Sequence, residues 1–90
     1  MSNQKLRQIK SLTSIPGVGK SIAEDLYNID IIFVDDLKDK DPEILYNQSN
    51  QYAGKVQDRC LLYVFRCAVY FAQGGRDVQK LKWWDWKDKK

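Results

Sequence analysis

The chain has no histidine and only two cysteines, two prolines and one methionine among its 90 residues. Without histidine a Cys/His zinc site is excluded, and two cysteines alone supply too few ligands for a structural zinc ion. Cys60 and Cys67 stand seven positions apart in one apolar segment, which as a helix separates them by about 10 Å on one face. A disulfide cannot bridge that distance. We therefore expect two buried, reduced thiols, as in a cytoplasmic protein.

Long hydrophobic runs are also missing. The N-terminus carries no apolar leader, and the most apolar stretch, residues 55–73, is interrupted by Arg66 and is too short to span a bilayer. We expect a cytoplasmic protein that makes no membrane contact. Its composition, 43% hydrophobic and 12% aromatic, is sufficient for the compact core of one small domain over residues 1–90.

Acidic residues are absent from the first twenty positions, which hold four bases: Lys5, Arg7, Lys10 and Lys20. Residues 21–50 hold eight acids against two bases, and residues 51–90 hold nine bases against four acids. The formal net charge of +3 thus conceals two positive ends and a negative middle. Positive ends favour a polyanionic partner, whereas the acidic middle is a candidate surface for a protein partner.

The most informative stretch is Ile15-Pro16-Gly17-Val18-Gly19-Lys20-Ser21. Proline presets φ at the second position of a turn, and the glycine after it can adopt the positive φ of a type II turn. Gly19 then leaves bare backbone where a helix begins and where several N–H groups lack partners inside the helix. Such donors at the positive end of the helix dipole suit a phosphate. Lys20 adds charge there, and Ser21 adds a hydroxyl.

With Leu12, Ala23 and Leu26, this stretch resembles the helix-hairpin-helix motif, which binds the DNA backbone without reading sequence. The resemblance covers residues 12–27 and implies that Gly17, Val18, Gly19, Lys20 and Ser21 contact DNA. In some relatives the hairpin carbonyls also hold a monovalent cation, and the matching positions here are Thr13, Ile15 and Val18. Hairpins of this type also occur as packing or protein-docking elements, and that alternative remains open.

Gly19-Lys20-Ser21 also matches the end of a nucleotide-binding P-loop. The first glycine of that motif would fall on Ser14, and the segment before it, residues 5–12, has the spacing of a helix rather than a strand. The hairpin is therefore the preferred interpretation.

Residues 31–51 have the pattern of a degenerate second hairpin. A short helix is expected over 34–37, and Asp41 and Pro42 are suited to the N-cap and first position of another helix. No Gly-x-Gly element lies between them, and the surrounding residues are acidic. We expect helix caps and a solvated face here rather than a phosphate site.

Residues 55–73 predict a long core helix, because apolar residues cover most of its circumference. Gly74-Gly75 ends it, and residues 77–87 hold a short helix over 78–84 and a tryptophan-rich tail. Tryptophans mixed with lysines can stack on unpaired bases. The preferred interpretation is that at least two of the three close the core, leaving one as a candidate protein contact.

The run from Asp58 to Phe71, with Asp41-Pro42 before it and Leu81-Lys82-Trp83-Trp84-Asp85-Trp86 after it, resembles a small bacterial family. Its members are labelled pathogenicity-locus or mitomycin-resistance proteins. The likeness spans about residues 12–87 and implies a stand-alone, all-helical, helix-hairpin-helix-like domain. We expect an all-α tandem helix-hairpin-helix or SAM-like bundle of five to six helices around a long apolar helix.

The sequence supplies no nucleophile, general base or metal cluster, which favours a binding module over an enzyme. The leading prediction is non-sequence-specific DNA binding through the first hairpin, in DNA repair or a stress response. The alternative is a protein-interaction adaptor that uses the acidic middle or the tryptophan tail.

Overall fold

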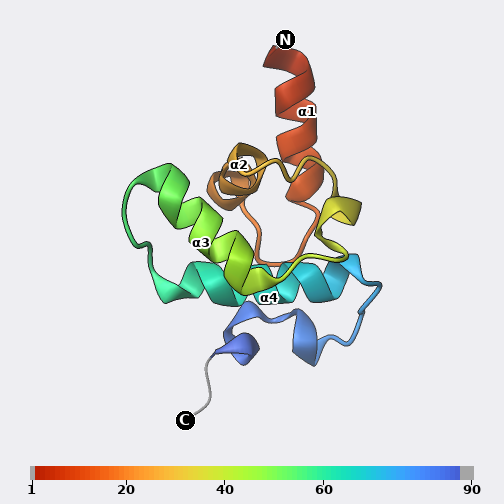
Figure 1. The fold of residues 1–90 in the computed structure, drawn as a ribbon. Helices are drawn as coiled ribbons and strands as arrows, with labels where there is room; N and C mark the ends of the chain where they lie inside the picture. Colours follow the sequence, from red (N-terminus) through yellow and green to blue (C-terminus); the bar gives the residue numbers. More distant parts are fainter. Residues whose placement is uncertain (1, 88–90) are drawn as a thin grey trace.

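The computed structural model describes residues 2–87, and every regular element in that range is helical (Figure 1). Within it, four α-helices span Ser2–Leu12 (α1), Lys20–Asn28 (α2), Pro42–Ala53 (α3) and Arg59–Ala72 (α4). The same range contains three 3-10 turns, at Val34–Leu37 (η1), Gln79–Leu81 (η2) and Trp83–Trp86 (η3). The predicted all-α class is confirmed. None of the described helices combines the length and apolar character needed to cross a bilayer.

The predicted tandem helix-hairpin-helix or SAM-like bundle of five to six helices is wrong, because the described residues form only four α-helices. The segments expected to add the others, 34–37 and 78–84, form 3-10 turns of three or four residues. Runs this short do not offset the cost of starting a helix. In the second segment, Lys82 has extended dihedrals (φ −91°, ψ 112°) and separates η2 from η3.

The long apolar helix over 55–73 is also wrong, since α4 begins at Arg59 and has 14 residues. Two of the three residues before its Asp58 cap are bound to α3 instead, and one of these bonds runs from the Lys55 amide to Asn50 O (3.2 Å). The Gln57 amide N–H donates to Asn50 Oδ1 (2.9 Å), and its side-chain amide donates to Ser49 Oγ (2.9 Å). Val56, which the periodic pattern places in the core, is 82% exposed.

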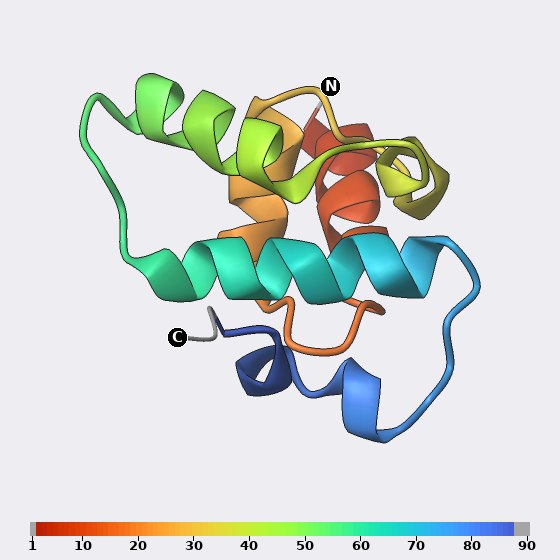
Figure 2. The same ribbon diagram turned by 60° about the horizontal axis from the view of Figure 1, so that its bottom comes forward.

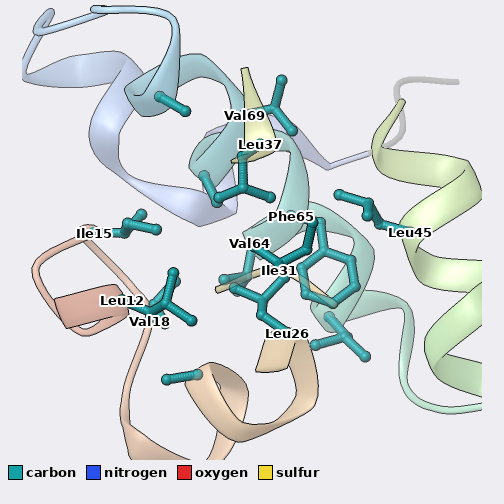
Figure 3. Packing of buried hydrophobic residues seen from close by; sticks show 14 of the residues in the cluster. Leu12, Ile15, Val18, Leu26, Ile31, Leu37, Leu45, Val64, Phe65 and Val69 are labelled. Carbon is teal, nitrogen blue, oxygen red and sulfur yellow. The ribbon is translucent and has the colours of Figure 1, made fainter. Parts of the chain in front are cut away.

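Helix α4 nevertheless lies at the centre of the fold. Its side chains Leu62, Phe65, Cys67 and Ala68 are completely buried. Figure 3 shows Val64, Phe65 and Val69 of α4 surrounded by core residues from the other elements: Leu12, Ile15, Val18, Leu26, Ile31, Leu37 and Leu45. Burial of this apolar surface is the main driving force for folding.

The other helical elements pack on two opposite sides of α4 (Figure 2). Helices α1, α2 and α3 lie on one side, and the C-terminal turns η2 and η3 lie on the other. The loop between α1 and α2, residues 13–19, emerges on the side of the C-terminal turns. The loop that carries the sequence motif is therefore held between α4 and the C-terminal segment.

Local signals determine where α2 ends and where α3 begins and ends. Asp30 adopts a left-handed conformation (φ 70°) after α2, and the next amide, that of Ile31, donates to Leu26 O (3.0 Å). This is the Schellman arrangement, with aspartate in the position that glycine usually occupies. Asp41 caps α3 by accepting from the Glu43 amide (2.9 Å), and Gly54 ends that helix at φ 72°.

Candidate nucleic-acid interface

The loop between α1 and α2 contains the predicted type II turn. Gly17 has φ 85°, and the Val18 amide closes the turn by donating to Ile15 O (3.0 Å). The Ile15 and Val18 side chains are buried, whereas Gly17 and Gly19 are exposed. Two apolar anchors thus hold the turn from behind while its backbone faces solvent.

The N-terminus of α2 is uncapped. Gly19 is the N-cap in extended conformation (φ −88°, ψ −175°), and no side chain caps the helix. Its carbonyl accepts the first helical bond, from the Ala23 amide (2.9 Å). Among the described residues, the N–H groups of Gly19, Lys20 and Ser21 have no hydrogen-bond acceptor, and all three residues are exposed. Their free donors lie at the positive end of the helix.

Two predicted residues contribute differently from the others. The Val18 amide is already engaged within the turn, so it is not free to donate to a phosphate. Gly17 packs against the tail, because a Cβ built on it would lie 3.1 Å from Cδ1 of Trp83. The donors open to a ligand are therefore those from Gly19 onward, with the Lys20 and Ser21 side chains beside them.

The three carbonyls predicted to hold a cation are likewise not equivalent. Ile15 O accepts the Val18 amide that closes the turn. Within residues 2–87, no hydrogen bond reaches the carbonyls of Thr13 and Val18, whereas the Thr13 hydroxyl bonds back to Lys10 O. The cation stays a prediction.

Charge differs between the two sides of the hairpin. On one side, a cavity of about 290 Å³ is lined by Lys10 and Lys20 together with residues of α1 and the loop: Leu6, Ile9 and Thr13. On the other side, a cavity of about 360 Å³ includes Asp25, Asp58 and Trp83. An anion is therefore attracted from the side of the two lysines.

The two carboxyl groups in the acidic cavity have pKa values shifted in opposite directions. Burial, with a further contribution from Glu24, raises the pKa of Asp25. Asp58 is the N-cap of α4, and the hydrogen bond from the Cys60 amide (2.9 Å) lowers its pKa. Both carboxylates therefore oppose a phosphate on this side.

Carboxylates in the second hairpin region, residues 31–51, bind backbone amides. Besides the Asp41 cap on α3, Asp36 Oδ2 accepts from the amides of Ile32 and Phe33, each at 3.0 Å. These donors are already satisfied by the protein's own negative charge. This arrangement is the one the sequence predicted for the acids of the middle segment.

The two cysteines are thiols with raised pKa values. Cys60 is half-buried and Cys67 is buried, and both are free thiols. Its hydrogen bond with Asp58 raises the pKa of Cys60, and burial raises that of Cys67, so the reactive thiolate form is disfavoured. Within the described range, no three Cys, Asp or Glu side chains are grouped so as to hold a metal ion.

The tail contributes one contact that the sequence did not specify. Trp83 is half-buried against the core and covers Gly17. The tryptophan content indicated that the tail closes the core, but no local pattern indicates which loop it meets. Trp86 is half-buried against Tyr70, whereas Trp84 remains 49% exposed.

Comparison with known proteins agrees with the resemblance found in residues 12–87. The family model described as Cdd1, pathogenicity locus, matches residues 5–90. The chain is 34% identical over 73 residues to a Streptomyces lavendulae protein named mitomycin resistance protein McrB, which covers 81% of this chain and 67% of that protein. No solved structure gives a significant match. The chain belongs to the pathogenicity locus family.

Proposed function

We propose that the segment α1–loop–α2 acts as a helix-hairpin-helix and binds the DNA backbone without sequence preference. The observation that carries this proposal is the uncapped N-terminus of α2. There the amides of Gly19, Lys20 and Ser21 have no acceptor among the described residues, and all three residues are exposed. Open amides at a helix N-terminus form an anion-binding arrangement. Lys10 and Lys20 line the adjacent cavity and add two positive charges.

In this mechanism the phosphate oxygens accept from the α2 amides, while Lys20 and the Ser21 hydroxyl add further contacts. Backbone donors contact phosphates and not base edges, so they position the protein without selecting a sequence. The buried Ile15 and Val18 keep the loop rigid, so little conformational entropy is lost on binding. The protein acts by binding rather than by catalysis.

We also propose that a monovalent cation at the carbonyls of Thr13, Ile15 and Val18 joins the loop to a phosphate. Replacing potassium by tetramethylammonium at constant ionic strength tests this, because the larger cation cannot fit between carbonyls. Affinity that drops in tetramethylammonium supports the bridge. Equal affinity in both salts argues that the amides and lysines bind alone.

The family supports a setting but not an activity. The Streptomyces lavendulae relative is named for mitomycin resistance, and we extend that name only to a stress-response role on cytoplasmic DNA. A domain with a net charge of +3 makes few phosphate contacts, so a protein partner is expected to supply more.

Fluorescence anisotropy with duplex and branched DNA across a salt series tests the proposal. The logarithm of the affinity should fall with the logarithm of salt concentration, with a slope of about −0.9 per phosphate neutralised. Lys20→Glu should weaken binding about 10- to 100-fold, as expected for a lost charge-assisted contact. Asp39→Lys, an exposed charge reversal in the second hairpin region, is the matched control and should not weaken binding.

A protein-interaction adaptor is the second candidate. Several large apolar side chains are exposed, among them Phe33, Ile44 and Trp84, and two of these lie in the acidic middle. The adaptor function is preferred if the domain does not bind DNA at low salt. It is also preferred if the Lys20→Glu variant binds DNA as well as the original protein does.

A further inference from the structure

A third cavity, separate from the two beside the hairpin, lies between α4 and the C-terminal turns. Its volume is about 620 Å³, which is within the range of small-molecule sites. Its walls come mainly from α4 and the tail, with Pro42 at the start of α3. The residues used below are Arg66, Val69, Tyr70, Lys80, Trp86 and Lys87. The proposed DNA contact at the hairpin does not use this cavity.

Hydrogen bonds fix the aromatic wall of this cavity. The rings of Tyr70 and Trp86 are 5.5 Å apart and inclined at 45°. The Trp86 indole N–H donates to Lys80 O (2.7 Å), and the Arg66 guanidinium donates to Trp86 O (2.7 Å). The Tyr70 hydroxyl accepts from the Asp77 amide (3.1 Å). Gly75 also packs on the Tyr70 ring, where an added Cβ would clash with Cζ. The Trp86 ring, which lines the cavity, is therefore the one that a planar group can meet.

The charges around the rings are mainly positive. Arg66, Lys80 and Lys87 line the cavity, against one carboxylate, Asp85. Lys80 Nζ lies 5.9 Å from the centre of the Tyr70 ring, so its positive charge is next to the aromatic wall. A ligand that complements this surface has a flat aromatic part and a compact negative group.

We propose that this cavity binds a nucleotide, with its base against Trp86 and its phosphate near Lys80 and Lys87. The nucleotide is either free or an unpaired residue of a DNA strand. The second source is sterically reasonable because Cys67 Sγ lies 3.9 Å from Pro16 O in the hairpin and 3.7 Å from Lys80 O. Hairpin and cavity are therefore neighbours on either side of this thiol.

Titration with deoxyadenosine 5′-monophosphate, followed by tryptophan fluorescence and calorimetry, tests the cavity directly. Deoxyadenosine and inorganic phosphate, each half of the ligand, should bind about tenfold more weakly or worse, since each lacks the stacking or the charge-assisted contact. Lys80→Glu should weaken nucleotide binding about tenfold while its backbone carbonyl still accepts from Trp86. Lys87→Glu is a second, independent charge reversal, and Lys55→Glu is the matched control at an exposed site outside the cavity.

Binding of a mononucleotide, a single-stranded oligodeoxynucleotide and a blunt duplex is compared. The comparison distinguishes a free nucleotide from an unpaired nucleotide of a strand, and it keeps this inference distinct from the hairpin proposal. Free nucleotide as the ligand predicts mononucleotide binding that depends on Lys80 and is no stronger for a single-stranded oligodeoxynucleotide. An unpaired nucleotide as the ligand predicts stronger oligonucleotide binding that depends on both Lys80 and Lys20. Blunt duplex binding that depends on Lys20 alone, with no nucleotide or oligonucleotide binding sensitive to Lys80 or Lys87, overturns the cavity proposal and leaves the hairpin proposal standing.

Discussion

The N-termini of α2 and α3 differ in whether a side chain of the protein accepts a hydrogen bond from the first backbone amides of the helix. At the start of α3, Asp41 accepts from the Glu43 amide, so the helix terminus carries its own negative charge. At the start of α2, Gly19 has no side chain, and no group within residues 2–87 accepts from the amides of Lys20 and Ser21. The α3 terminus therefore has a carboxylate on one of its amides, and the α2 terminus has no such group among the described residues.

The charges nearby reinforce this difference. The α2 terminus has Lys10 and Lys20 beside it, whereas residues 34–41 before α3 hold four aspartates against Lys38 and Lys40. A helix terminus alone is therefore a poor indicator of an anion site. What distinguishes the two is whether the chain already supplies a capping carboxylate.

Giving α2 the cap that α3 has should have the largest effect on function. In Gly19→Asp the new carboxylate can accept from the Ser21 amide, as Asp41 does two residues along α3. The position has φ −88°, and nothing lies within 4 Å of an added Cβ, so aspartate fits without strain. We expect DNA affinity to fall about 10- to 100-fold in anisotropy titrations, because the carboxylate occupies the Ser21 amide and repels the DNA phosphate. The domain should be more stable by a few tenths of a kcal/mol.

Gly19→Asn is the matched control, because it can cap the same amide without a charge. It should reduce affinity less than Gly19→Asp. If Gly19→Asp binds DNA as well as the original protein does, the α2 terminus does not hold phosphate and the contrast with α3 has no functional meaning.

Gly17→Ala should have the largest effect on stability. The alanine would have to adopt φ 85°, and its methyl would lie 3.1 Å from the Trp83 ring, so strain and crowding add together. We expect a loss of about 1–3 kcal/mol in the free energy of unfolding, measured by urea denaturation. Gly54→Ala has similar dihedral strain but no neighbour within 4 Å. It should cost less, and an equal cost would show that the Trp83 contact contributes nothing.

Features set by a few neighbouring residues could be predicted from the sequence. Pro16-Gly17 requires the type II turn, and Asp41-Pro42 begins a helix for reasons of local hydrogen bonding and fixed φ. After α2, Asp30 takes the left-handed conformation (φ 70°) that glycine usually supplies, which is also a local effect. Each of these depends on contacts within about five positions of the chain.

Features set by distant contacts could not be predicted. Periodicity extended the core helix to Lys55, but Gln57 is bound by Ser49 and Asn50 of the preceding helix, which prevents the extension. Trp83 packs against Gly17, and no sequence pattern relates these two residues. In the cavity near the tail, Tyr70 and Trp86 come together only because the tail folds back on α4.

Removing the cap from α3 tests the other half of the contrast. Asp41→Ala leaves the Glu43 amide without its acceptor, and we expect a loss of about 1 kcal/mol in the free energy of unfolding. DNA affinity should not change, because this terminus takes no part in the proposed contact. Asp41→Asn keeps an acceptor oxygen and should retain most of the stability. An affinity that rises in Asp41→Ala would mean that the capped terminus can also hold phosphate.

The smallest effect concerns two carboxylates that lie in one cavity beside the first hairpin. Burial raises the pKa of Asp25, so its ionised form disfavours the folded state at neutral pH, and this penalty disappears as the pH falls through the raised value. Asp25→Asn should therefore melt at a slightly higher temperature at neutral pH, with the difference vanishing below pH 3.8, the ordinary pKa of the group.

Asp58 supplies the opposite sign within the same cavity. Its pKa is lowered by the Cys60 amide, so its charge favours the folded state above the ordinary pKa, and this contribution is lost as the pH falls through the lowered value. Asp58→Asn should melt at a lower temperature at neutral pH, and the difference should again close in acid. Melting curves for the two variants between neutral and acidic pH therefore diverge in opposite directions from that of the original protein. Curves that shift in the same direction would show that these carboxylates act through net charge and not through their own hydrogen bonds and burial.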